Sequence, residues 1–306
     1  MKRFFLLFSI AFLLTGCTKS VQLDDSQIQT PVVNRAKQAK KILQAKKTNA
    51  KELPSVLGGI IQSDSWIIHR DKQQEEFSGH VFYDNGTYTF KADYALSERT
   101  LNRFTATGNV YLKQQDQKGS SYEAYAHKAI FNYKTQQGSL TANKTAPVRL
   151  IYTVPLQPTV KATAQKVTFD LEQQIFTLEG NVKMERPSPE GMQTLSANKM
   201  IIRQTENYIQ LEGNAVLSDG LRFLEAETIV YDGTHNQSYA YGSRPLLKGT
   251  TEQGTFAIIA DRVSSDAEGN QISLDGKVQG WFVSPEVNQV DFSKFNQGLS
   301  YGTTQQ

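Results

Sequence analysis

A short phrase of alternating apolar and polar residues recurs along this chain and constrains its fold more than any other feature. It reads FTATGNV at 104–110, FTLEGNV at 176–182, IQLEGNA at 209–215 and ISLDGKV at 272–278, with a fainter FSGHV at 77–81. Such alternation is typical of a β-strand with one buried face. The glycine falls on the apolar side of the alternation, where it indicates a bend or a close approach to the backbone.

A second phrase precedes these strands. It consists of an alanine, a polar residue, any residue and then an apolar one. Its copies are KADYAL (91–96), YAHKAI (125–130), TAQKVTF (163–169), SANKMII (196–202), EAETIVY (225–231) and IADRVSS (259–265). Polar, turn-rich residues separate the two phrases, so each unit is predicted to be two strands joined by a turn.

The units repeat about every 33 residues, from about residue 60 to about residue 287, and the copy near Asn143 has lost the glycine. A period in this range is typical of a stacked array in which each unit buries its face against its neighbours. The alternation excludes helical repeats, and a propeller blade needs four strands where this unit has two. We therefore predict an all-β fold, an elongated antiparallel β-jellyroll or β-taco of about seven two-stranded repeats. Up to fourteen strands would stack along one axis with their apolar faces inward.

The parity of the repeated phrase assigns one set of residues to the interior. The predicted inward residues are Phe104, Ala106, Gly108, Val110, Phe176, Leu178, Gly180, Val182, Ile209, Leu211, Gly213, Ala215, Ile272, Leu274, Gly276 and Val278. Small residues alternate with large ones along this set, which favours a narrow apolar trough. An apolar face is also required for an interior filled by side chains, so the pattern leaves both readings open.

The first seventeen residues, MKRFFLLFSIAFLLTGC, place two basic residues before a short apolar run. This is the layout of a secretory signal, and the run is shorter than the roughly 20 residues that a membrane span needs. Its end, LTGC, resembles the bacterial lipobox, which implies that Cys17 is lipidated and becomes the first residue of the mature protein. Cys17 is the only cysteine in the chain, so no disulfide can form within it.

The predicted organisation is a lipoprotein signal peptide at 1–16, a tether at 17–57, the repeat domain at 58–291 and a polar tail at 292–306. The tether contains NRAKQAKKILQAKKTNAKEL (34–53), a basic and marginally helical stretch. It fits a solvated spacer, and it also fits an arm that contacts anionic lipid headgroups.

No pattern of catalytic or cofactor-binding residues emerges. The formal net charge is only +3, which argues against a nucleic-acid binder. The four histidines, His69, His80, His127 and His235, have no metal-ligand spacing. The carboxylates fall on outward positions or in turns, unlike the gathered carboxylates of a polysaccharide-cleaving enzyme. We therefore expect no enzymatic activity, no metal and no cofactor.

The paired phrases, over about residues 60–287, resemble the OstA-like repeats of the lipopolysaccharide-transport proteins LptA and LptC and of the N-terminal domain of LptD. The resemblance implies a V-shaped β-jellyroll that holds the acyl chains of lipid A and passes them along a periplasmic bridge. The implied partners are lipopolysaccharide, other OstA-like jellyroll proteins and, for an LptC-like role, the inner-membrane ABC transporter. The inward residues would then be the lipid-contacting set. A structural or polysaccharide-binding lipoprotein with a filled interior is the alternative.

The sequence is compatible with more than one membrane for the anchor and with more than one arrangement at the ends of the array. An LptC-like role places the anchor in the inner membrane, whereas Thr18 after the lipidated cysteine points to the outer membrane under enterobacterial sorting. An open array also leaves an unpaired strand near residues 63–68 and another near 276–283. Unprotected edges of this kind suit pairing with a neighbour of the same fold. The C-terminal tail could instead fold back and cover the second edge.

Overall fold

The computed structural model describes residues 60–115, 119–188, 191–251, 254–266 and 271–283. Cys17, the signal peptide, the tether up to residue 57 and the polar tail lie outside the described residues. Within those ranges the chain is almost entirely β, and the 3₁₀ turn η2 (Arg99–Leu101) is the one helical element.

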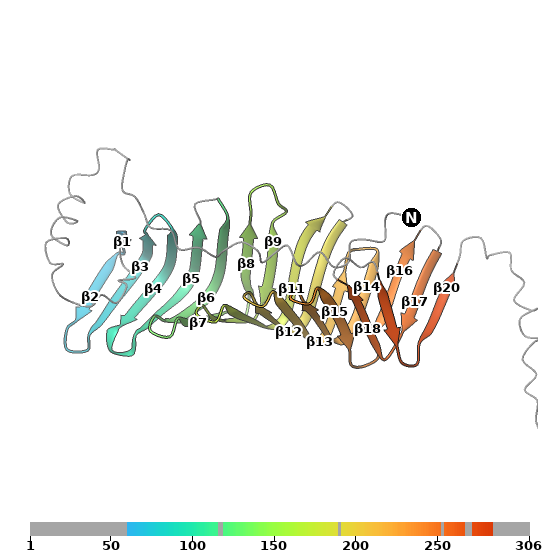
Figure 1. Ribbon diagram of the computed structural model, residues 1–306. Coiled ribbons are helices and arrows are strands. Elements are labelled where there is room, and N and C mark those ends of the chain that lie inside the picture. Colours follow the sequence, from blue (N-terminus) through green and yellow to red (C-terminus); the bar gives the residue numbers. More distant parts are fainter. Residues whose placement is uncertain (1–59, 116–118, 189–190, 252–253, 267–270, 284–306) are drawn as a thin grey trace, which may run out of the picture.

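Twenty strands form a single antiparallel system. Their bounds are β1 (Ile60–Gln62), β2 (Ser65–His69), β3 (Gln74–Asp84), β4 (Tyr88–Glu98), β5 (Arg103–Gln115), β6 (Ser121–Asn132), β7 (Gln137–Thr141), β8 (Val148–Thr153), β9 (Val160–Ala164), β10 (Lys166–Asp170), β11 (Ile175–Ser188), β12 (Gly191–Arg203), β13 (Tyr208–Ser218), β14 (Arg222–Asp232), β15 (Gln237–Tyr241), β16 (Leu246–Thr251), β17 (Gly254–Ile259), β18 (Arg262–Asp266), β19 (Ile272–Asp275) and β20 (Gln279–Val283). Figure 1 shows them stacked side by side along one axis, from β2 at the blue end to β20 at the red end.

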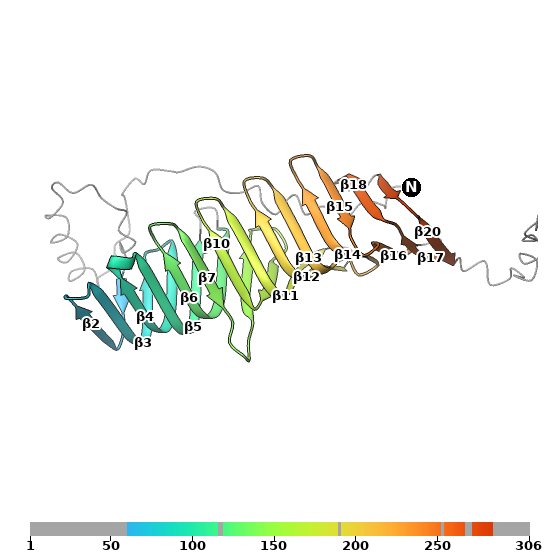
Figure 2. The ribbon, with the colours of Figure 1, turned by 90° about the horizontal axis from the view of Figure 1, so that it is seen from below.

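The strands make two layers, because each long strand bends in its middle and contributes one half to each. One layer, here called the β2 layer, runs in the order β2, β3, β4, β5, β6, β7, β10, β11, β12, β13, β14, β15, β18, β19. The other, the β1 layer, runs β1, β3, β4, β5, β6, β8, β9, β11, β12, β13, β14, β16, β17, β20. Fourteen strand segments therefore stack in each layer. Figure 2 shows the stack from below, and the arrangement confirms the predicted architecture.

The bend between the layers lies at the Gly-Asn step of the repeated phrase. In β5 the register shifts between Thr107 and Val110, so Gly108 and Asn109 lie outside the ladder. Both have left-handed backbones, with φ of +73° and +45°. Glycine and asparagine are the residues that adopt this conformation most readily. Skipping two residues keeps the alternation in phase, so the apolar face stays inward on both sides of the corner.

The prediction that the glycines face inward is wrong. A Cβ on Gly213 would lie 2.7 Å from Asn198 Nδ2, and Gly108, Gly180 and Gly276 meet Asp93, Gln165 and Asp261 in the same way. These partners are the polar residues of the Ala-polar phrase. Each glycine therefore lies at the corner, packed against the polar residue of the preceding strand. The glycine of the first phrase and the polar residue of the second phrase therefore meet at the same corner.

The copy that lacks the glycine turns its corner differently. Residues 142–147 form a loop between β7 and β8. Asn143 Oδ1 holds this loop by accepting hydrogen bonds from the backbone N–H groups of Thr145 (2.9 Å) and Ala146 (2.7 Å). An asparagine that bonds to the backbone two and three residues ahead is a common turn device. The loop replaces the two-residue corner without interrupting either layer.

Candidate functional site

The space between the inner faces of the two layers, here called the trough, is the candidate site. The inward row of the β2 layer nearest the corner runs through directly opposed residues of neighbouring strands. Its members are Trp66, Phe77, Ala95, Ala106, Ala129, Leu140, Val167, Leu178, Met200, Leu211, Ile229, Ala240, Val263 and Leu274. From Phe77 to Val263 every one of them is buried. Side chains therefore fill the trough beside the corner.

The next inward row of the same layer is farther from the corner and is less covered between β5 and β11, whereas Ile209 and Tyr231 farther along it are buried. Phe104, Phe131, Phe169 and Phe176 lie in it and are only partly buried. The Phe169 ring is 6.2 Å from that of Phe131 and 6.5 Å from that of Phe176, centroid to centroid. Gly138 lies between Phe131 and Phe169 in the row, and a Cβ there would collide with the Phe169 ring. The row thus presents a band of aromatic surface along the middle of the trough.

The β1 layer faces this band with an aliphatic row. Leu112, Leu150, Met184, Leu195, Leu217, Leu224 and Leu247 are its large members and belong to the core or pack against it. At the N-terminal end Phe90 of this layer meets Phe104 edge-on at 5.2 Å between centroids. The two layers therefore enclose apolar surface along the whole length of the array.

The sequence-predicted set divides into three groups and one exception in the structure. Ala106, Val110, Leu178, Val182, Ile209, Leu211 and Ala215 are buried between the layers. Phe104, Phe176, Ile272 and Leu274 are partly buried against the same core. The four glycines are at the corners, as described above. Val278 is 48% exposed because it follows the last described corner, and none of the described residues forms a further unit that covers it.

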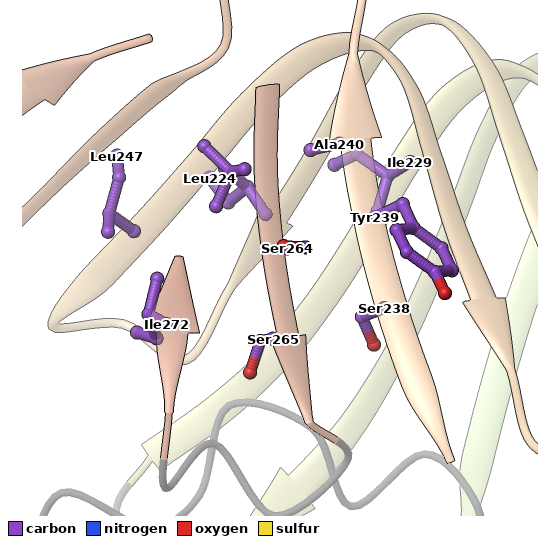
Figure 3. A pocket seen from close by; sticks show the side chains of 10 residues that line it. Leu224, Ile229, Ser238, Tyr239, Ala240, Leu247, Ser264, Ser265 and Ile272 are labelled. Atoms are coloured by element: carbon purple, nitrogen blue, oxygen red, sulfur yellow. The ribbon is translucent and has the colours of Figure 1, made fainter. Parts of the chain in front are cut away.

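Polar side chains that the sequence pattern did not single out enter the trough near its C-terminal end. Ser238 and Ser265 are opposed residues of β15 and β18 and are 2% and 6% exposed. They line a small cavity of about 10 Å³ together with Leu224, Leu247 and Ile272 (Figure 3). Ser265 Oγ donates to the carbonyl of Asp266 at 2.7 Å, whereas Ser238 Oγ has no partner among the described residues. Their inward parity in the sequence indicates this location, but a pattern defined by apolar residues does not include serine.

Each buried carboxylate of the described residues, on Glu75, Glu98 and Asp219, has an arginine partner. Glu75 and Glu98 are 8% and 6% exposed. Arg99 bonds to Glu75, and Arg103 Nε lies 2.6 Å from Glu98 Oε2. A buried carboxylate needs such a partner. These pairs serve the fold, since the arginines occupy the carboxylate oxygens.

In the described part of the chain no three His, Cys, Asp or Glu side chains are grouped closely enough to hold a metal ion. A search of the same ranges for a helix with the length and apolar character of a membrane span finds none.

Comparisons with known proteins were made for the whole chain. A family model described as LptA/(LptD N-terminal domain) LPS transport protein matches residues 60–149 and 146–208. A model of the prokaryotic membrane lipoprotein lipid attachment site matches residues 1–18. No curated protein matches the chain. Among solved structures, LptH, described as the LptA-homologous periplasmic component of the lipopolysaccharide transport device of Pseudomonas aeruginosa, is 13% identical. That match covers 51% of this chain and 83% of LptH, with a TM-score of 0.26.

Proposed function

We propose, from the premise that residues 60–208 of this chain belong to the LptA and LptD N-terminal family of lipopolysaccharide-transport proteins, that the trough carries lipid A acyl chains. The family match supports a role in lipopolysaccharide transport. The finer assignment rests on one observation, the band of partly buried aromatic side chains that continues across strands β5, β6, β10 and β11. A continuous band suits a cargo that moves, because an acyl chain leaving one unit finds equivalent surface on the next.

The energetics favour an extended binding surface over a single pocket. Removing an acyl chain from water is worth about 0.8 kcal/mol per CH₂ group, so exposing even part of a chain in transit would be costly. Fourteen strand segments at about 4.8 Å spacing make an array about 60 Å long. The trough is long enough to keep the chains of one lipid covered while they advance.

Photo-crosslinking from paired positions on one strand tests this proposal. A photoreactive amino acid at Phe104 or Phe176 should give an adduct with lipopolysaccharide in cells. The same residue at the neighbouring outward position, Thr105 or Thr177, should not, because alternate residues of a strand face opposite sides. Leu211 is a poorer site, since it is 2% exposed and any change there would disturb packing. Equal adducts from both faces, or none from the inner face, would contradict the proposal and favour a filled interior.

We further propose that the protein is held at a membrane by lipid on Cys17. The match of residues 1–18 to the lipid attachment model supports this assignment. Two acyl chains suffice for stable anchoring. Mass spectrometry of the mature N-terminus would detect the lipidated cysteine, and an unmodified N-terminus elsewhere would exclude it. Fractionation then distinguishes the inner membrane, expected for an LptC-like role, from the outer membrane indicated by Thr18.

The proposed partners are other jellyroll proteins of the same fold, joined end to end, and the ABC transporter in the case of an LptC-like role. The strands at the ends of the array support this. Within the described residues β2 pairs only with β3, and β20 pairs only with β17. Trp66, Ile67 and Ile68 of β2 are 46–58% exposed. A further strand added at either edge would extend both the sheet and the trough.

A further inference from the structure

The outer face of the β1 layer carries a ladder of aromatic and basic side chains that the trough does not use. Phe82, Lys91, Tyr111, Tyr125 and Arg149 are opposed in turn across strands β3, β4, β5, β6 and β8. Their inward neighbours Val110 and Leu112 belong to or contact the core, so the ladder faces away from the trough. It lies next to the corner, beside the loop at 142–147.

The ladder is held together by contacts between cations and rings. Lys91 Nζ lies 5.9 Å from the ring centroid of Phe82 and 5.7 Å from that of Tyr111. The Tyr111 and Tyr125 centroids are 5.0 Å apart, and Arg149 Cζ lies 4.6 Å from that of Tyr125. The ring faces are thus occupied by neighbours.

The ladder borders a groove that exists only because one corner is irregular. The groove has a volume of about 550 Å³ and is lined on one side by Lys91, Tyr111, Tyr125 and Arg149. The loop at 142–147 supplies its other wall through Asn143, Ala146 and Pro147, and the corners add Asn109 and His127. This volume is in the range of ordinary ligand sites, about 300–1,000 Å³.

Among the described residues, the two cations that line the groove are not paired with carboxylates. Neither Lys91 nor Arg149 forms an ion pair with a carboxylate in the described part of the chain, whereas Lys199 and Arg222 contact Glu212 and Asp219 at 3.1 and 2.6 Å. Two acidic residues lie near the groove but do not line it. Asp93 Oδ2 accepts a hydrogen bond from Asn109 Nδ2 at 2.9 Å, and Glu123 Oε2 accepts one from the Tyr125 hydroxyl at 2.9 Å. The groove therefore offers unpaired cations and amide groups to an acceptor-rich ligand.

We propose that this outer groove binds an anionic carbohydrate, a sugar chain that carries phosphate or carboxylate groups. The backbones of Lys91 and Arg149 are three strand spacings apart, about 14 Å, so an extended ligand with several charges suits the groove better than one small anion. A sugar chain can place its hydroxyls against Asn109 and Asn143 and its charges at the two ends. Arginine favours such a ligand because its planar fork pairs with two oxygens at once. The site is on the opposite face of the strands from the trough and does not depend on the trough's cargo.

Binding measurements on the purified full-length protein in detergent test the proposal. The probe is the phosphorylated oligosaccharide freed from lipopolysaccharide by mild acid, compared with the same oligosaccharide after phosphatase treatment and with inorganic phosphate. The intact oligosaccharide should bind at least tenfold more tightly than either. Its affinity should fall at higher salt, because exposed charges are screened. Equal binding before and after phosphatase treatment, or no binding, would overturn the proposal.

Variants locate the site. Lys91→Gln with Arg149→Gln should lower the affinity at least tenfold. Asn143→Asp is the gentler variant, since an aspartate keeps the oxygen that accepts the loop's hydrogen bonds and adds only negative charge; it should also weaken binding severalfold. Arg262→Gln is the matched control, because Arg262 lies 4.9 Å from the Tyr239 ring centroid but does not line the groove. Unchanged affinity in the first two variants, or an equal loss in the control, would overturn the assignment.

The last measurement uses intact lipopolysaccharide, which presents the same sugar chain attached to lipid. Tight binding of the free oligosaccharide identifies a carbohydrate site that acts by itself. Binding of intact lipopolysaccharide alone, unaffected by the groove variants, would place recognition in the trough and reject the groove.

Discussion

At the scale of single residues, the corner explains why the phrase recurs. Gly213 and Asn214 have φ of +74° and +49°, and the place of the missing Cβ is taken by the Asn198 side chain. At Gly108 the following residue, Asn109, also bonds to the opposed Asp93. The repeated letters are therefore a requirement of the bend. The residues that face the candidate cargo are the variable apolar ones on either side.

Gly213→Ala should destabilise the protein by about 1–2 kcal/mol, because a left-handed backbone costs an L-residue that much. The crowding against Asn198 adds to the cost. The double variant Gly213→Ala with Asn198→Ala should regain the stability lost to crowding but not the stability lost to backbone strain. Urea unfolding of the three proteins measures both parts. A Gly213→Ala protein as stable as the parent would contradict this account of the corner.

His80 lies at another corner, and its pKa can be measured. Its Nδ1 lies 2.8 Å from Asp64 Oδ2. The hydrogen bond with Asp64, followed by the charge of that carboxylate, raises the pKa of His80 above its ordinary value of 6.5. A raised pKa stabilises the fold below about pH 6.5, and this contribution is lost as the pH rises through the raised value. An NMR titration should find the raised pKa in the parent and a lower one in Asp64→Asn. The same pKa in both proteins would show that the pair does not form.

At the scale of elements, each long strand is continuous in sequence but contributes to both layers. β11 runs from Ile175 to Ser188 and pairs with β10 before its corner and with β9 after it. Each long strand thereby ties the two layers together. The strands at the ends have a partner on one side only among the described residues.

The edge strand β20 should mediate association. Trp281 and Val283 are 58% and 63% exposed, so Trp281→Lys with Val283→Lys should leave stability nearly unchanged. Lysine on an edge strand opposes pairing with another strand. Pulldown of a second copy of the chain should therefore weaken severalfold.

Leu221→Lys is the control for this edge, since Leu221 is 56% exposed in a hairpin turn between β13 and β14. It should leave association unchanged. Equal association in the β20 variant and the parent would mean that the edge is not the joint. The C-terminal tail would then be the first candidate for covering it.

At the scale of the whole molecule, the array is close to one-dimensional. Each strand pairs with strands no more than three places away along the chain, so stability is expected to be a sum of local terms. In this respect the array differs from a compact domain, in which a single substitution destabilises the whole structure.

Hydrogen exchange should reveal this order. Amides of β11, β12 and β13 should exchange slowest, and those of β2 and β20 fastest, because opening begins at ends with one neighbour. Met200→Ala, at a site with 0% exposure, should cost about 2–5 kcal/mol. Its faster exchange should be confined mainly to the units around β12. Uniform acceleration along the array would show that the fold opens as one cooperative unit.

The sequence by itself determined the β class, the number of units and the inward parity of residues such as Ala106, Val110, Leu178 and Leu211. Alternation and period are local properties, and each unit repeats the same local solution. Only the tertiary structure decided how the units bend. The inward assignment of Gly108 failed because alternation assumes a continuous strand, whereas two left-handed residues leave the ladder at each corner. The exposed Val278, the buried Ser238 and the groove beside Arg149 likewise depend on which neighbour is present, absent or displaced. Such contacts join residues far apart in the chain, and no local pattern encodes them.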